Sequence, residues 1–115
     1  MQAAFDLLPN SHYNPVFIVG DADEVIEMLS DRSNSYLVHG IANIDAASIA
    51  NCSCRIIRDF EEIETVPVLQ EKVADFLGSC ILQGKQIVII SKKEINSMKL
   101  EGRLRSRVCS GVIIE

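Results

Sequence analysis

The sequence predicts an α/β fold, with a single small domain over residues 1–115 that holds about five mostly parallel strands and three to four helices packed on the sheet. Hydrophobic residues make up 48% of the chain and aromatic residues only 5%, so the core must consist of Val, Ile, Leu and Ala, as in buried strands and the helices that cover them. Strand-like apolar runs alternate with helix-like patterns along the chain. This order favours a parallel sheet with right-handed crossovers.

The predicted strands are apolar runs that end at glycine, proline or polar residues. The first is VFIV (16–19), which follows a polar leader over residues 1–15 and stops at Gly20. Three further strands are predicted over 36–42, 52–57 and 86–90. From Leu100 onward, apolar and basic residues alternate, which predicts a C-terminal edge strand with a bulge or a turn at Gly111.

Helices are predicted where apolar residues recur every three or four positions. Asp21 can accept hydrogen bonds from the amides of a first helical turn, and Glu24 follows three residues later as in a capping box, so a helix begins there and ends near Ser30. The longest helix has Pro67 in its first turn and is stopped by Gly84. Two short helices are predicted over 45–50 and 91–99. Because the first of these gives a short crossover, a mixed sheet with one antiparallel pairing stays open as an alternative.

The four cysteines raise the question of a metal site or a disulfide, because Cys52 and Cys54 are only one residue apart. On a strand these two side chains share the face of Ile56, which we interpret as a core face, and Cys80 falls on the apolar stripe of the longest helix. Cys109 is the one expected to be partly exposed. Structural zinc sites usually hold thiolates at C-x₂₋₄-C spacing, which this sequence lacks. We expect reduced thiols, no metal and no cofactor, with a zinc site or a Cys52–Cys54 redox pair as the alternative.

The junction between the first strand and the first helix, VFIVGDADE, is a candidate site. Ligands in open α/β sheets bind beyond the carboxyl ends of the strands, so Gly20, Asp21 and Asp23 form a loop where two carboxylates could hold Mg²⁺. With Asp59 after the third strand, they would give a small metal-assisted phosphoryl-transfer enzyme or nuclease. The simpler interpretation is that the aspartates cap the helix, because no second acidic pair follows another strand.

The same stretch resembles the opening of response-regulator receiver domains, in which paired acidic residues follow the first strand. The resemblance implies that Asp59 is a phosphoacceptor and that Ser91, after the fourth strand, is a switch hydroxyl. The sequence departs from the receiver pattern because Gly20 stands at the first acidic position and the final helix is missing. The lysine after the fifth strand also has no counterpart.

Charge is distributed unevenly along this chain, whose net charge is −5. Residues 92–107 contain six basic residues and two acidic ones, whereas the preceding 91 residues contain five basic and thirteen acidic ones. On a strand, alternate arginines would lie about 6.6 Å apart on one face. Such a strip, made of Lys99, Arg103, Arg105 and Arg107, suits phosphate oxygens or a partner's carboxylates, or else protects an exposed edge strand from pairing with other chains.

These patterns favour a non-catalytic binding or regulatory module over an enzyme. We expect it to engage an anionic ligand or an acidic protein surface through the basic strip, and to form a homodimer that covers the apolar run Val112-Ile113-Ile114. The metal-assisted enzyme and a degenerate receiver-like signalling domain are the alternatives. Overall acidity argues against non-specific binding of nucleic acid. No apolar run approaches the roughly 20 residues of a membrane span, so we expect a cytoplasmic protein without membrane partners.

Overall fold

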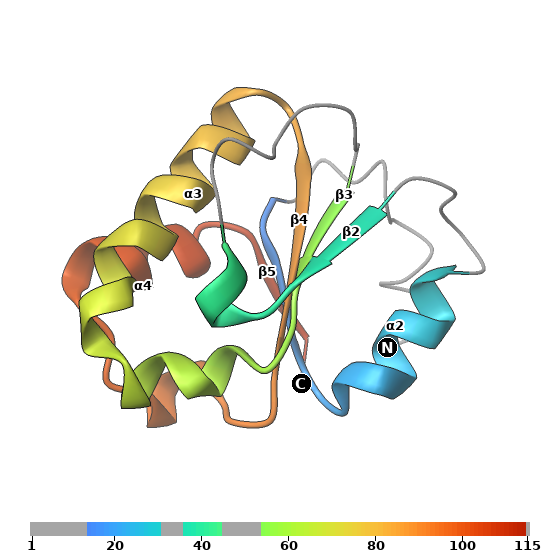
Figure 1. The fold of residues 1–115 in the computed structure, drawn as a ribbon, viewed down its shortest axis with the longest axis horizontal. Coiled ribbons are helices and arrows are strands. Elements are labelled where there is room, and N and C mark those ends of the chain that lie inside the picture. Colours follow the sequence, from blue (N-terminus) through green and yellow to red (C-terminus); the bar gives the residue numbers. More distant parts are fainter. Residues whose placement is uncertain (1–13, 31–35, 45–53, 115) are drawn as a thin grey trace.

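Five parallel strands form one sheet in the computed structural model, which describes residues 14–30, 36–44 and 54–114 (Figure 1). The strand order is β2-β3-β4-β1-β5, and each neighbouring pair runs parallel. The strands are β1 (Val16–Val19), β2 (Tyr36–His39), β3 (Cys54–Ile57), β4 (Gln86–Ser91) and β5 (Val112–Ile114). The α/β prediction is confirmed, and the sheet is parallel rather than mixed.

Helices cover both faces of the sheet, with α3 and α4 on one side and α2 on the other (Figure 1). They are α2 (Ala22–Ser30), α3 (Gln70–Leu82) and α4 (Gly102–Val108). Alternate side chains of β1 point to opposite faces, so Phe17 packs in the core beneath α3 and α4, whereas Val16 and Ile18 pack in the core beneath α2. This two-sided burial explains why β1 and residues 87–90 of β4 are continuous apolar runs.

The predicted first and longest helices are confirmed. Asp21 caps α2, because its Oδ1 accepts a hydrogen bond from the Glu24 backbone N–H at 3.0 Å. Before α3 the chain makes a 3-10 turn, η4 (Pro67–Leu69), with Pro67 at its start as predicted. The end of α3 is set by Gly84, whose φ of +72° is a left-handed conformation that glycine adopts without strain.

The C-terminal basic segment is the main error in the prediction. Residues 102–108 form α4 rather than an edge strand, and the strand is formed by Val112–Ile114 after a turn that includes Gly111. Leu104 and Val108 are both fully buried and lie four residues apart, so a single helical face delivers them to the core. Ser106, which a strand would have placed beside them, is exposed.

Two other boundaries differ from the sequence prediction. Strand β2 ends at His39 rather than at residue 42, because the chain turns into a 3-10 helix, η1 (Ile41–Asn43), with a hydrogen bond from Asn43 N–H to Gly40 O at 3.1 Å. The helix predicted over 91–99 is only a 3-10 turn, η5 (Ile95–Ser97). Ser91 instead ends β4 and bonds Lys93 through its hydroxyl, which closes a tight turn.

Some predictions fall outside the described residues, namely most of the polar leader, the short helix over 45–50 and the placement of Cys52. Within the described part of the chain, no helix is long and apolar enough to cross a membrane.

Candidate functional site

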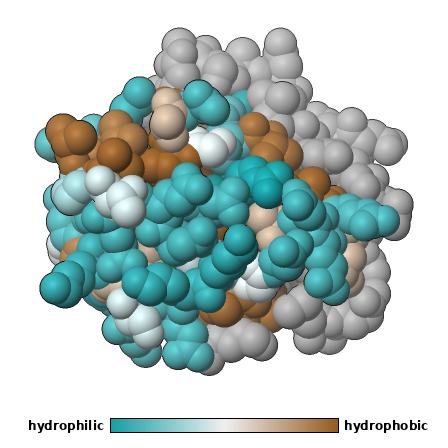
Figure 2. Space-filling model, turned by 60° about the horizontal axis from the view of Figure 1, so that its bottom comes forward, coloured by the Kyte–Doolittle hydropathy of each residue, from teal (hydrophilic) through white to brown (hydrophobic). Residues whose placement is uncertain are grey.

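The carboxyl ends of the strands carry the polar side chains from which a site could be built. The turn after β1, the segment after β3 and the loop after β4 all lie at this end of the sheet (Figure 1). Hydrophilic residues dominate this face of the molecule in the space-filling view (Figure 2). A ligand here would therefore be recognised by charges and hydrogen bonds.

The turn between β1 and α2 is short and already occupied by the protein's own carboxylates. Only Gly20 and Asp21 separate the strand from the helix, and Gly20 N–H donates to Ser91 O at 2.9 Å, which ties the turn to the end of β4. The carboxylate of Asp21 takes up the Glu24 N–H in the first turn of α2. Asp23 and Glu24 add further negative charge to that turn. An external anion would therefore meet negative charge at this helix N-terminus.

Arg58, directly after β3, links two of the candidate acidic residues. Its Nη2 lies 2.9 Å from Asp23 Oδ1, and its Nε donates to Asp59 Oδ2 at 2.9 Å. The hydrogen bond to Asp59, and then the one to Asp23, raise the pKa of the Arg58 guanidinium. The structure thus brings Asp23 and Asp59 to one cation, while Asp21 serves the helix. Among the described residues, no group of three or more His, Cys, Asp or Glu side chains is placed to hold a metal ion.

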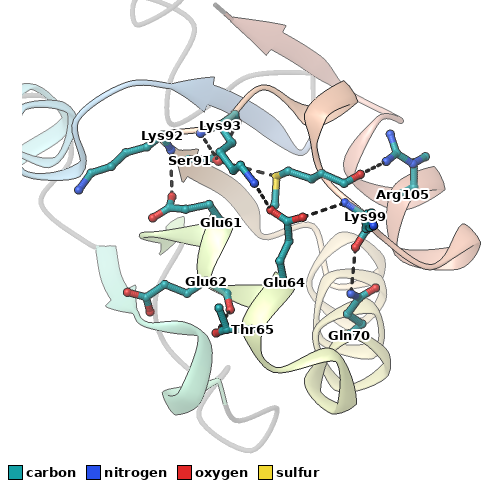
Figure 3. Close-up of polar contacts among 11 residues, drawn as sticks. Glu61, Glu62, Glu64, Thr65, Gln70, Ser91, Lys92, Lys93, Lys99 and Arg105 are labelled. Atoms are coloured by element: carbon teal, nitrogen blue, oxygen red, sulfur yellow. Dashed lines mark hydrogen bonds and ion pairs between the residues drawn. The ribbon is translucent and has the colours of Figure 1, made fainter.

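The loop of residues 92–101, between β4 and α4, is fixed by two glutamates of the 3-10 helix η3 (Phe60–Thr65) (Figure 3). Glu61 Oε1 accepts from Lys92 N–H at 2.9 Å. Glu64 accepts from Lys93 Nζ at 2.6 Å and from Lys99 N–H at 3.2 Å. The hydrogen bond to Lys93, and then that to the Lys99 backbone, lower the pKa of the Glu64 carboxyl.

Three more side chains hold this loop from other directions. Gln70, in the first turn of α3, donates to Lys99 O at 3.2 Å and accepts from Glu101 N–H at 2.6 Å. Arg105 of α4 donates to Ile95 O at 3.3 Å and also to Met98 O. Backbone groups of the loop thus find partners on η3, α3 and α4, so its lysines project from a rigid support.

The arginines of the predicted basic strip do not share one surface. Arg103 Nη2 lies 3.0 Å from Asp75 Oδ1 and donates to Glu71 O at 3.3 Å, which attaches α4 to α3. Arg107 donates to Ala74 O on the same helix. Arg105 points instead at the loop. The helix therefore replaces the row of three guanidinium groups with three separate contacts, and the 6.6 Å spacing expected of a strand does not apply.

The Arg107 guanidinium lies across Gly78, where a Cβ would be only 2.5 Å from Arg107 Nη1. Together with Asp75, Ser79 and Leu82, these residues line a hollow of about 490 Å³ beside α3. A second hollow of about 480 Å³ is lined by Ile44, Val68, Glu71, Lys72, Asp75, Phe76 and Ser79. Neither hollow includes Gly20, Asp21 or Asp23.

No disulfide joins the cysteines among the described residues, which are Cys54, Cys80 and Cys109. Cys54 packs beneath α2, whereas Cys80 lies on the buried side of α3, on the opposite face of the sheet, so the two cannot share a metal. Burial raises the pKa of the Cys80 thiol, which keeps it protonated. Cys109 is exposed, as predicted.

Two polar residues on neighbouring strands, Arg55 and His39, are buried. Arg55 of β3 is fully buried, and His39 is 7% exposed with its ring edge-on to Phe76 at 5.5 Å. Desolvation, and then the charge of Arg55, lower the pKa of His39, although a hydrogen bond with the Asn43 backbone opposes them. Both residues lie within strand patterns, where alternation alone could not distinguish a buried polar side chain from an exposed one.

The resemblance to receiver domains does not extend to topology. Receiver domains have the strand order 2-1-3-4-5, in which β1 lies between β2 and β3. Here β1 lies between β4 and β5, and β3 pairs directly with β4. The Asp59 and Ser91 positions implied by that resemblance therefore lie in a different sheet arrangement.

Comparison with known proteins finds a similar fold but no similar sequence. No family model and no curated protein sequence matches this chain. AMPPCP-bound DnaA from Aquifex aeolicus superimposes with a TM-score of 0.78 at 18% identity, over 99% of this chain and 44% of that one. The replication initiator DnaA bound to AMPPCP and single-stranded DNA gives 0.76 at 16% identity, over 99% of this chain and 43% of that one. Domain III of the Thermotoga maritima replication initiation protein DnaA gives 0.73 at 19% identity, over 98% of this chain and 59% of that one. The chain thus spans less than two thirds of each of these structures and has the fold found in DnaA replication initiators.

Proposed function

We propose that this chain is a non-catalytic, oligomeric binding module that acts in DNA replication in the cytoplasm. It engages an acidic protein surface, or another anionic ligand, through the exposed cations of the segment over residues 92–107. The likeness to DnaA initiators supports the replication context. The mode of binding is supported by the exposed cations of residues 92–107 and by the carboxylates at the N-terminus of α2.

The observation that carries the proposal is the occupied N-terminus of α2. Helix N-termini that follow a strand of a parallel sheet are common phosphate sites, because their free N–H groups and dipole favour negative charge. In this chain Asp21 takes up such an N–H, Asp23 is paired with Arg58, and only two residues separate β1 from α2. A nucleoside triphosphate would have to displace carboxylates there, although two of the similar structures are bound to AMPPCP.

The same contacts argue against a metal-assisted enzyme. Asp21 and Asp23, the two carboxylates that would hold Mg²⁺, are used in a helix cap and an ion pair. Asp59 is held by the same arginine as Asp23. Metal-binding carboxylates would need to converge on one empty position, whereas these converge on the Arg58 guanidinium.

Binding falls mainly to three cations of the segment. Lys92 and Lys99 are exposed, and their ammonium groups form no hydrogen bond or ion pair with the described residues. Arg103 is 44% exposed, although it is paired with Asp75. Arg105 and Arg107 donate to backbone carbonyls and serve as support. A rigid support reduces the entropy lost when these cations bind a partner.

The test is binding of three probes at low and high salt, with polyglutamate as the acidic surface, AMPPCP as the nucleotide and a single-stranded oligonucleotide as the nucleic acid. We expect salt-sensitive binding of polyglutamate and no binding of AMPPCP. The double variant Lys92→Gln/Lys99→Gln should weaken polyglutamate binding about tenfold or more, since each exposed charge-assisted contact is lost.

The matched control is Lys72→Gln/Lys85→Gln, which removes the same charge from outside the segment and should retain most of the affinity. Equal losses of polyglutamate affinity in the two double variants would show that binding depends on net charge rather than on the position of the lysines. Stoichiometric AMPPCP binding would contradict the exclusion of a nucleotide from the N-terminus of α2, and preference for the oligonucleotide would point to nucleic acid as the partner. Titration with the purified DnaA of the same organism tests the replication context.

A further inference from the structure

Strand β5 forms one edge of the sheet and carries no charge. It pairs with β1 on its inner side, and no described strand pairs with its outer side. Residues 109–114 read CSGVII, without a charged residue or a proline. Natural edge strands are usually blunted by charges, proline, bulges or shortness, and this one has only its three-residue length.

The backbone of Ile113 faces the open edge. Val112 N–H donates to Pro15 O at 3.1 Å, which directs the peptide groups of Val112 toward β1. Because successive residues of a strand direct their N–H and C=O to opposite sides, those of Ile113 face away from β1. The Ile113 side chain is 38% exposed. One residue therefore offers a donor, an acceptor and an apolar surface together.

We propose that a second copy of this chain pairs with β5 in an antiparallel arrangement centred on Ile113. The two Ile113 residues then exchange both of their N–H···O bonds across a twofold axis, and Val112 of each copy faces Ile114 of the other. The two sheets join into one. This inference rests on the proposed oligomer and adds the surface through which it forms.

The strand fits a second copy better than an unrelated protein. Its antiparallel pairing with itself sets apolar residues against apolar residues at every position. It offers no charged group that would select a different partner. Two copies of a chain with net charge −5 carry the same net charge, and the uncharged run CSGVII is a place where they can approach without bringing like charges together.

The contact is small, so the dimer is weak and depends on concentration. The surface area buried by pairing two three-residue strands is below the roughly 1,000 Å² expected of a stable interface. The dimer therefore belongs among the transient contacts. We expect the dimer to form as the concentration rises from about 10 μM to about 1 mM.

Sedimentation equilibrium over this range, combined with amide hydrogen exchange, tests the inference on the full chain. The Ile113 amide should gain protection as concentration rises, whereas the Val112 amide, already bonded to Pro15, should change little. Ile113→Lys places a charge on the open edge and should abolish dimerisation, because two like charges would meet at the twofold axis. Val68→Lys, at a residue that is 83% exposed and outside the sheet, is the control and should dimerise like the unmodified chain.

A monomer at every concentration would overturn both this inference and the oligomer proposed above. An oligomer that survives in Ile113→Lys would overturn the inference alone and leave the proposed oligomer standing. Polyglutamate binding by a monomeric Ile113→Lys variant would show that the binding function is independent of this contact.

Discussion

Gly111 packs so closely against Pro15 that a Cβ at this position would overlap the Pro15 carbonyl oxygen and lie 2.8 Å from its carbonyl carbon. Both groups belong to the backbone, so no side chain can rotate to relieve the overlap. Pro15 immediately precedes β1, and Gly111 precedes β5. This close approach lets Val112 donate to Pro15 O, which sets the start of the pairing between the two strands.

Gly111→Ala should therefore destabilise the fold by about 2 kcal/mol or more, because β5 must move away from β1 to admit the methyl group. Chemical denaturation followed by circular dichroism measures the free energy of unfolding. Gly102→Ala is the matched control, since a Cβ at Gly102 would meet no atom within 4 Å and alanine favours the helix. Equal stability of the two variants would contradict the close approach of Gly111 to the Pro15 backbone.

Arg105→Gln should destabilise the fold by about 1 to 2 kcal/mol, because the carbonyls of Ile95 and Met98 lose a charged donor. Thermal unfolding compares this variant with Ser106→Ala, which changes an exposed neighbour on α4 and should alter stability by no more than about 0.5 kcal/mol. If residues 102–108 were a strand with its arginines in solvent, Arg105→Gln would have no larger effect than the control.

Strands and helices were predicted correctly where the spacing of apolar residues fitted only one kind of secondary structure. The runs at β1 and β4 are apolar throughout, and the stripe of α3 repeats at three- and four-residue steps. Residues 103–108 fit the periodicity of a helix and also that of a strand. Leu104 and Val108 are four residues apart, as on one face of a helix, and they would also share one face of a strand, on which every second side chain points the same way. Burial of both side chains against the core, with Ser106 in solvent, favours the helix, and this tertiary contact is not visible in the sequence.

The candidate site could be predicted only residue by residue. The helix cap by Asp21 is local and was predicted from the spacing to Glu24. The contact between Arg58 and Asp23 depends on where β3 and β1 end relative to each other, which the sequence does not contain. For the same reason the hydrogen bonds from the loop of residues 92–101 to η3 could not be foreseen.

Glu64→Gln should loosen the loop of residues 92–101, because the neutral amide loses the ion pair with Lys93 and weakens the bond to the Lys99 N–H. Amide exchange at Lys99 should become faster. Glu62→Gln, in the same 3-10 helix but with an exposed side chain, should leave that exchange unchanged. Faster exchange in both variants would assign the effect to η3 as a whole rather than to Glu64.

The lowered pKa of Glu64 also predicts an acid dependence of stability. A carboxyl whose pKa is lower in the folded state stabilises the fold above its unfolded pKa, and this contribution is lost as the pH falls through the folded pKa. The stability of the unmodified chain should therefore fall more steeply below about pH 4.5 than that of Glu64→Gln. Denaturation experiments measure the free energy of unfolding against pH for the two proteins. Curves that run parallel below about pH 4.5 would contradict the lowered pKa of Glu64.

His39 should make stability depend on pH at a higher range. Its pKa is lowered by desolvation and by Arg55, so the folded state holds the neutral ring while the unfolded chain takes up a proton at about pH 6.5. Stability is then unaffected above pH 6.5 and is lost as the pH falls below it, until the folded pKa is reached. The Nε2 atom of His39 is buried and has no hydrogen-bond partner among the residues that the structure describes, so a proton added there would find no acceptor among them. His39→Gln removes the titrating group, and its free energy of unfolding should stay level between about pH 7 and pH 5 while that of the unmodified chain falls. Unfolding by urea at several pH values measures both curves, and a fall of equal slope in the variant would assign the pH dependence to other groups.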